Sequence, residues 1–164
     1  MIAIVQTALL WFAAVGCAAI GGVYFAFSFF IMVALQKAGQ EAGMLAMQAI
    51  NDVILRSLFM PLFFGTTLAS AALAGLAIWQ WPLPQSKMIF AGGVLFVAGM
   101  FLVTIFFNVP LNNKLMAANA ARPESAGVWA EYLKTWTMWN SIRTIASIAA
   151  AILFIIALIR EASA

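Results

Sequence analysis

Three side chains that could bind a ligand share one face of the helix predicted around residue 140. Trp136, Asn140 and Arg143 follow one another at intervals of four and three residues, which places them on one helical stripe. A guanidinium presents a planar set of donors to a carboxylate, phenolate or phosphate, and an amide adds donors and an acceptor. Indole rings, here those of Trp136 and Trp139, can stack on a flat aromatic molecule. The pattern predicts a site for a planar ligand with negative charge or acceptor oxygens.

Further polar residues border the other apolar segments at the same predicted end of the protein. They are Asn51 and Arg56 before the second segment, Asn108 and Asn112 after the third, and Tyr24 and Ser28 before the end of the first. In a bundle of four helices these side chains can all point inward at one depth. We therefore predict a polar pocket that contains two guanidiniums and opens toward that end.

The acidic residues do not balance these cations. Asp52 precedes Arg56 by four residues and Glu131 precedes Lys134 by three, and both spacings allow ion pairs on a helix. Arg143 has no acidic neighbour at such a spacing. An unpaired cation is unfavourable in apolar surroundings. The sequence therefore predicts that a phenolate, a carboxylate or a lipid head group supplies the countercharge.

A purely structural interpretation of the same residues stays open. Tryptophan and tyrosine are common at membrane interfaces, and an arginine near a helix end can extend to lipid phosphates. Asparagine side chains can also donate to backbone carbonyls that are free at helix ends. On this interpretation the residues form an interfacial belt and cap helices, and they bind no ligand.

The composition indicates the class of protein. Of 164 residues, 66% are hydrophobic and 8% are charged, which is typical of a polytopic membrane protein and not of a soluble domain. The chain contains no histidine and one cysteine, Cys17. These counts exclude a haem or metal held by histidine, a serine–histidine pair and a two-cysteine redox motif. We predict no cofactor, no metal and no nucleic-acid partner.

Four apolar segments reach the length of about 20 residues that a helix needs to cross a bilayer. They are residues 4–35, 57–79, 88–107 and 141–159. We predict one all-α membrane domain, residues 1–164, folded as a four-helix bundle. The opening MIAIVQTALLWF lacks a basic start and a small-residue cleavage site, so we expect a retained span and not a signal peptide.

The connections between the spans differ in length. The two long ones, residues 36–56 and 108–140, follow odd-numbered spans and lie at one end of the bundle, here termed the elaborated end. The short turn between the second and third spans lies with both termini at the plain end. The first long connection has the apolar spacing of an amphipathic, interfacial helix that runs into the second span. Pro110 is expected to break the third helix just after Asn108.

The basic residues indicate an orientation. Six lie at the elaborated end and two at the plain end, so the positive-inside rule predicts a cytoplasmic elaborated end and external termini. Small residues also recur every four positions on the first span, at Ala14, Ala18, Gly22 and Ala26. Such a ridge allows close helix packing, within the bundle or in a homo-oligomer.

Four motifs occur in a fixed order along the chain. They are GGVYFAFSFFIMVAL, MQAINDVILRSLF, FFNVPLNNKL and WTMWNSIR. Together they cover nearly the whole sequence and resemble the anthrone oxygenase family of small four-helix membrane proteins. The most specific parts are Asn108-Val-Pro110-Leu-Asn112 and Trp139-Asn140-x-x-Arg143. The resemblance implies a helical membrane fold with its polar elements gathered at one end.

The resemblance also implies an activity. Fungal members oxidise anthrones to anthraquinones with dioxygen, and their sequences commonly contain histidines, which this chain lacks. An imidazole base is therefore absent here. An anthrone enolate could pass one electron to dioxygen without a metal if the protein stabilises both negative species. The implied function is a membrane-embedded, oxygenase-like oxidoreductase that binds an aromatic, quinone-like or lipidic small molecule.

Roles for the candidate residues follow from this chemistry. The candidate catalytic residues are Arg143, Tyr24 and Asn108: the arginine would stabilise the anions, the amide would donate a hydrogen bond, and the tyrosine would relay a proton. A tyrosine has an ordinary pKa of about 10, so it is a reluctant base at neutral pH. The candidate ligand-binding residues are Asn51, Arg56, Asn112, Trp136, Trp139 and Asn140.

Two other classes of function stay open. A non-catalytic, lipid-interacting or accessory membrane protein agrees with the tryptophan-rich, basic elaborated end. A small transporter agrees less well, because the first span, residues 4–35, has no Asp or Glu to carry protons. In each case the expected partners are membrane lipids and a small aromatic or lipidic ligand, and the expected location is a bacterial inner membrane.

Overall fold

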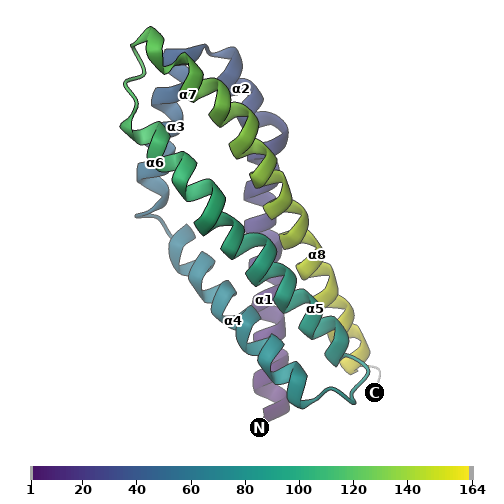
Figure 1. Ribbon diagram of the computed structural model, residues 1–164. Coiled ribbons are helices and arrows are strands. Elements are labelled where there is room, and N and C mark those ends of the chain that lie inside the picture. The colour runs from purple at the N-terminus through teal and green to yellow at the C-terminus, as the bar shows by residue number, and fades with distance from the viewer. Residues whose placement is uncertain (1, 163–164) are drawn as a thin grey trace.

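The computed structural model describes residues 2–162, and the elements in that part of the chain are all helical (Figure 1). Segments η1, η2, η3 and η5 are π-helical, and η4 is a 3₁₀ turn. The elements are α1 (Ile2–Ala26), η1 (Phe27–Ile31), α2 (Met32–Lys37), α3 (Gln40–Ile54), α4 (Phe59–Trp79), α5 (Ser86–Phe96), η2 (Val97–Leu102), η3 (Thr104–Asn108), α6 (Val109–Ala117), η4 (Pro123–Ser125), α7 (Ala126–Glu131), η5 (Tyr132–Trp136) and α8 (Thr137–Ala162).

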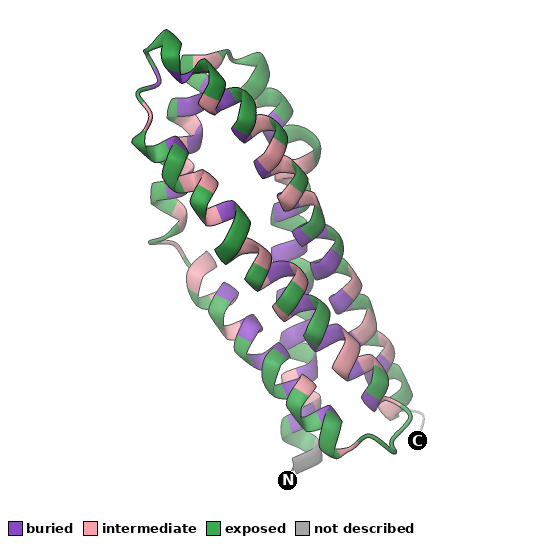
Figure 2. Cartoon of the chain, in the orientation of Figure 1, coloured by how far each residue is buried: buried purple, intermediate pink, exposed green. Residues whose placement is uncertain are grey.

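Within the described part of the chain, four continuous helices are long and apolar enough to cross a membrane. They are Ile4–Lys37, Phe59–Trp79, Ser86–Ala117 and Pro123–Ala162. Their outward faces carry large apolar side chains, such as Leu68 and Ile145, and Figure 2 shows exposed positions along the outside of the bundle. A soluble protein rarely exposes apolar surface on this scale. The protein is an integral membrane four-helix bundle, as the sequence predicts.

The expected helix break at Pro110 is wrong, because the third helix continues to Ala117. Proline disrupts an α-helix by removing a backbone donor to the residue four positions earlier. Here the preceding segment, η3, is already π-helical, with a wider hydrogen-bonding pattern, and Pro110 lies in the first turn of α6. The proline therefore sits where the chain changes from one helical form to another.

The two ends of the bundle differ as the sequence predicts. Both termini and the α4–α5 turn lie at the plain end, whereas α2, α3, α6 and α7 lie at the elaborated end (Figure 1). We term the group of α3, α6, α7 and η5 the cap. Its core contains Met44, Met47, Leu115, Trp129 and Tyr132, which are all buried.

The amphipathic helix of the first long connection is confirmed as α3, but it does not run into the second span. It ends at Ile54, and α4 begins only at Phe59. Ser57 stabilises this break, since its hydroxyl donates to the Ile54 carbonyl at 2.8 Å and accepts the Phe59 N–H at 3.2 Å. The chain can therefore turn between the cap and the bundle.

Small residues bring the helices together toward the plain end. A Cβ added at Gly93 of α5 would lie 2.5 Å from the Ser70 carbonyl of α4, so only glycine permits this approach. Toward the elaborated end, phenylalanines fill the space between α4 and the third helix. The ring centroids of Phe63 in α4 and Phe101 in η2 are 5.7 Å apart. Because large side chains replace small ones, α4 separates from the third helix near the cap.

Candidate functional site

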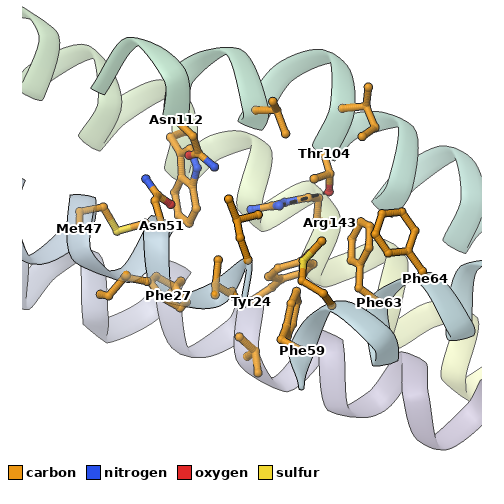
Figure 3. A pocket seen from close by; sticks show the side chains of 18 residues that line it. Tyr24, Phe27, Met47, Asn51, Phe59, Phe63, Phe64, Thr104, Asn112 and Arg143 are labelled. Atoms are coloured by element: carbon orange, nitrogen blue, oxygen red, sulfur yellow. Dashed lines mark hydrogen bonds between the residues drawn. The ribbon is translucent and has the colours of Figure 1, made fainter. Parts of the chain in front are cut away.

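A cavity of about 150 Å³ lies between the cap and the Phe63–Phe101 contact. Side chains from α1, η1, α3, α4, η3, α6, η5 and α8 line it. Figure 3 shows Phe27, Met47 and Asn51 on one side of the Arg143 side chain and Phe63 on the other. The wall is apolar except for a few nitrogen and oxygen groups that converge near Arg143.

Arg143 is the charged residue of this wall. Its side chain is held within the bundle, and the residue is only 4% exposed. Nη2 donates to Asn140 Oδ1 at 2.7 Å. Nη1 donates to Thr104 Oγ1 at 3.2 Å (Figure 3). Two neutral acceptors thus fix the guanidinium plane, one from α8 itself and one from η3.

Two aromatic rings cover the faces of this guanidinium. The Arg143 Cζ atom lies 4.1 Å from the centroid of the Tyr24 ring and 5.3 Å from that of Trp136. Such cation–π contacts partly replace the lost hydration of a buried cation. They do not neutralise it. Within residues 2–162 the ion pairs are Arg56–Asp52 and Lys114–Glu131, so Arg143 has no carboxylate partner there.

Asn140 positions Arg143 against the first helix. Its Nδ2 donates to the Tyr24 carbonyl and to Ser28 Oγ, both at 2.7 Å, while its Oδ1 accepts from Arg143. Ser28 Oγ also lies 3.0 Å from Ser141 Oγ. All three hydrogen-bonding functions of the amide are used inside the bundle. Asn140 therefore fixes both the arginine and the tyrosine carbonyl, and does not itself line the cavity.

Three buried N–H donors of the cavity-lining side chains have no acceptor among the described residues. They are Arg143 Nε, Asn51 Nδ2 and Trp136 Nε1. A buried donor without an acceptor is unfavourable by about 1–3 kcal/mol, and more when the group is charged. Three such donors at one cavity favour a ligand with acceptor oxygens, whereas an apolar filling would leave them unpaired.

An aromatic stack in the cap holds Trp136 in place. The rings of Trp129, Tyr132 and Trp136 form a nearly parallel stack with Tyr132 in the middle. The centroid of Tyr132 lies 6.0 Å from that of Trp129 and 5.4 Å from that of Trp136. The Tyr132 hydroxyl donates to Asn112 Oδ1 at 2.8 Å, which ties the stack to α6. Stacked rings with a satisfied hydroxyl are rigid, so the cavity wall at Trp136 is preformed.

The structure brings together most of the residues predicted for the site. Tyr24, Asn51, Asn112, Trp136 and Arg143 all line the one cavity. The predicted stripe of Trp136, Asn140 and Arg143 is confirmed as an inward face, because all three residues are buried. Their catalytic and ligand-binding roles stay predictions.

Besides Asn140, three predicted site residues do not reach the cavity. Arg56 follows the end of α3, pairs with Asp52 at 3.3 Å and has an 80% exposed side chain, so the cavity holds one guanidinium and not two. Trp139 stacks on Phe107 at 3.8 Å on the outer side of its helix. Asn108 is buried, but its Nδ2 donates to the Trp136 carbonyl at 3.2 Å, so it joins η3 to η5 behind the wall.

Two other expectations are also corrected. Glu131 of α7 pairs with Lys114 of α6 and not with Lys134. This ion pair joins α6 to α7 within the cap. The cavity is not open toward the elaborated end, because the cap covers it. Gln48 Nε2 of α3 donates to the carbonyls of Leu115 and Ala118 at 2.8 and 2.9 Å, which holds the cap closed.

Sequence reasoning missed Thr104 and the phenylalanines of the wall. Thr104 accepts from Arg143 and lies one helical turn before Asn108, on the same inward face. That spacing could have identified it. Phe59, Phe63 and Phe64 gave no such signal, since phenylalanine is ordinary in a membrane span.

The chemistry of this wall suits an anionic or oxygen-rich planar ligand. Among residues 2–162, no three His, Cys, Asp or Glu side chains are grouped to hold a metal ion. A reaction without a bound metal or cofactor stays a prediction. The cavity offers one fixed cation, further N–H donors and several flat apolar faces.

Comparison with known proteins identifies one family. A family model described as anthrone oxygenase matches residues 55–153, which is more than half of the chain. The matched region includes α4, the whole third helix and the part of α8 that carries Asn140 and Arg143. Comparison with curated proteins and with solved structures gives no match.

Proposed function

We propose a function from the premise that this chain belongs to the anthrone oxygenase family. The protein is a membrane-embedded oxygenase for a planar aromatic ketone or phenol of the anthrone type. Arg143 is the binding and catalytic centre of the proposal. Trp136 and Tyr24 provide flat faces, and Asn51 provides a further donor. A bacterial inner membrane is the proposed location, with membrane lipids around the bundle.

The single observation that carries this proposal is the buried, unpaired charge of Arg143. The guanidinium is held by two neutral acceptors and two rings, and none of the chain's carboxylates reaches the cavity wall in the described residues. Removing such a charge from water costs several kcal/mol, and an anion in contact with it recovers much of that free energy. A site built this way favours a substrate in its anionic form.

The expected reaction converts the methylene group of an anthrone to a ketone. One molecule of dioxygen is consumed: one oxygen atom becomes the new carbonyl, and the other leaves as water with the two methylene hydrogens. The substrate must first lose a proton to form an enolate, which then passes an electron to dioxygen. Arg143 stabilises the enolate oxygen through its free Nε–H, and the unpaired N–H donors of Asn51 and Trp136 stabilise the reduced oxygen species.

The chain provides a weak route for the proton. Tyr24 is the phenol whose ring contacts the guanidinium, and its hydroxyl donates to Met100 Sδ at 3.8 Å. The chain has no imidazole, and no carboxylate lines the cavity. The absence of a strong base from this wall favours the second candidate function, a protein that binds the same ligand without turning it over.

Paired arginine variants test the proposal. Purified protein in liposomes is supplied with anthrone, and dioxygen uptake is measured together with the absorbance of anthraquinone. Arg143→Lys keeps the charge but loses the planar contacts to Thr104 and Asn140, so we expect kcat/KM to fall about 100-fold. Arg56→Lys, the exposed control, should match wild type. Equal turnover by both variants overturns the proposal, and anthrone binding without dioxygen uptake establishes the second candidate.

A further inference from the structure

The cap closes the cavity against water at the elaborated end. Met44, Met47, Leu115 and Tyr132 are almost fully buried between the cavity and the outside of the cap. Gln40 Nε2 also donates to the carbonyls of Ala120 and Arg122, at 3.2 and 2.9 Å, so α3 is fastened to the loop before η4. A ligand that came from the aqueous side would have to displace this packed layer.

One side wall of the cavity is made of exposed apolar side chains. Leu55, Phe64 and Ile105 line the cavity and are 64%, 48% and 42% exposed. Phe64 and Ile105 belong to the helices Phe59–Trp79 and Ser86–Ala117, which cross the membrane. In the bilayer their outer surfaces therefore contact lipid. We term these three residues the portal.

The packing of the bundle explains why an opening lies here. Gly93 and Ser70 bring α4 and α5 into backbone contact near the plain end, whereas nearer the cap the rings of Phe63 and Phe64 lie between α4 and Phe101 of η2. Between Ile54 and Phe59 the chain is not helical, so no helix covers the cavity at Leu55. On this side the cavity therefore lies between α4 and η3, which are not in close contact there.

We infer that the ligand reaches Arg143 directly from the hydrocarbon layer of the bilayer, through the portal of Leu55, Phe64 and Ile105. The inference rests on the proposed function for the position of the ligand within the cavity. It also narrows the substrate class. A charged molecule is costly in hydrocarbon, so the molecule that arrives is uncharged, planar and lipid-soluble, and carries a ketone or phenol oxygen.

This route separates two requirements of the site. Partition from water into lipid concentrates an apolar aromatic molecule beside the portal, and the apolar wall gives it a path without unpaired polar groups. Only at the inner end does it meet Arg143 Nε, Asn51 Nδ2 and Trp136 Nε1, the three buried donors that lack an acceptor in the described residues. An analogue with a permanent charge, such as an aryl sulfonate, meets the closed cap instead and is excluded, whereas an aryl carboxylic acid can enter through the lipid in its neutral, protonated form.

A bilayer-dissolved photolabel tests the route without any substrate. A phenyl diazirine has one ring, and a cavity of about 150 Å³ accommodates a benzene-sized molecule, whereas a three-ring anthrone would extend from the cavity into the portal. After illumination of wild-type protein in liposomes, mass spectrometry should find label on Tyr24 and Trp136, which are each 5% exposed. Ile105→Trp fills the portal and should lower that inner labelling at least tenfold.

Matched controls make each outcome decisive. Phe106→Trp changes the neighbouring, outward-facing residue, which does not line the cavity, and should label like wild type. Leu55→Trp blocks the portal from the other side and replaces Ile105→Trp if that variant folds poorly. Any of three results overturns the inference. Inner labelling is absent in wild type, both portal variants leave it unchanged, or a charged, water-soluble diazirine gives stronger inner labelling. If inner labelling behaves as expected but anthrone does not bind, the portal stands and the proposed substrate is wrong.

Discussion

Replacing Thr104 by aspartate should give Arg143 the counter-ion that it lacks. Thr104 Oγ1 accepts from Arg143 Nη1 at 3.2 Å, and the aspartate carboxylate is close to threonine in size. Thr104 is half-buried on the wall of a cavity of about 150 Å³, which leaves room for the additional oxygen. Thr104→Asn is the neutral control, since it has the same shape without the charge.

The expected loss of affinity follows from the charges. A ligand oxyanion on the free Nε of Arg143 would lie roughly 6 Å from the new carboxylate, and at an effective dielectric constant of about 20 their repulsion is about 3 kcal/mol. That free energy corresponds to roughly a 100-fold higher Kd. The protein should not lose stability, because the aspartate pairs with a cation that is already buried.

Fluorescence titration with anthracene-2-carboxylate, a flat aromatic anion, measures the Kd, and thermal unfolding in the same detergent measures stability. We expect Thr104→Asp to bind about 100-fold more weakly than Thr104→Asn and to unfold at the same or a higher temperature. Equal affinity in the two variants would refute the idea that a ligand anion neutralises Arg143. A large drop in the unfolding temperature of Thr104→Asp alone would refute the assignment of Arg143 as an unpaired cation.

Three further predictions test the site and the packing of the bundle. Asn140→Leu removes both the acceptor for Arg143 and the donor to the Tyr24 carbonyl, and should lower the free energy of unfolding by about 3–5 kcal/mol in chemical denaturation; a loss under 1 kcal/mol contradicts its positioning role. Trp136→Phe keeps a ring but removes the unpaired indole donor, so the Kd for anthracene-2-carboxylate should rise about tenfold, whereas Trp139→Phe should change nothing. Gly93→Leu should lower the unfolding temperature, since its Cβ would lie 2.5 Å from a carbonyl of α4, and Gly75→Leu, with open space around it, should not; equal effects would show that the close contact is unimportant.

The fold was largely predictable because the bilayer restricts the choices. Spans must be apolar, long and helical, so hydropathy alone identifies them. The inward stripe of Trp136, Asn140 and Arg143 was predictable for a similar reason. Polar side chains on one face of a membrane helix point away from lipid, and all three are buried.

The partners of the site residues were harder to predict. Arg56, like Arg143, follows an asparagine near the start of a span. However, α3 ends at Ile54, so the Arg56 side chain lies outside the bundle and pairs with Asp52. Asn108 does face inward, but the sequence does not show that its amide donates to the Trp136 carbonyl, and Trp139 is adjacent to Asn140, so it lies on another face of α8. The cap over the cavity depends on contacts between α3 and α6, which are about 70 residues apart along the chain.

A structure of the protein in lipid nanodiscs with anthracene-2-carboxylate would test the central claim most directly. The claim is that the buried Arg143 guanidinium is present to contact a ligand oxygen. We expect density for the planar ligand in the cavity beside Trp136, with a carboxylate oxygen about 3 Å from Arg143 Nε. A cavity filled by a lipid chain, with Arg143 still bonded only to Thr104 and Asn140, would contradict it.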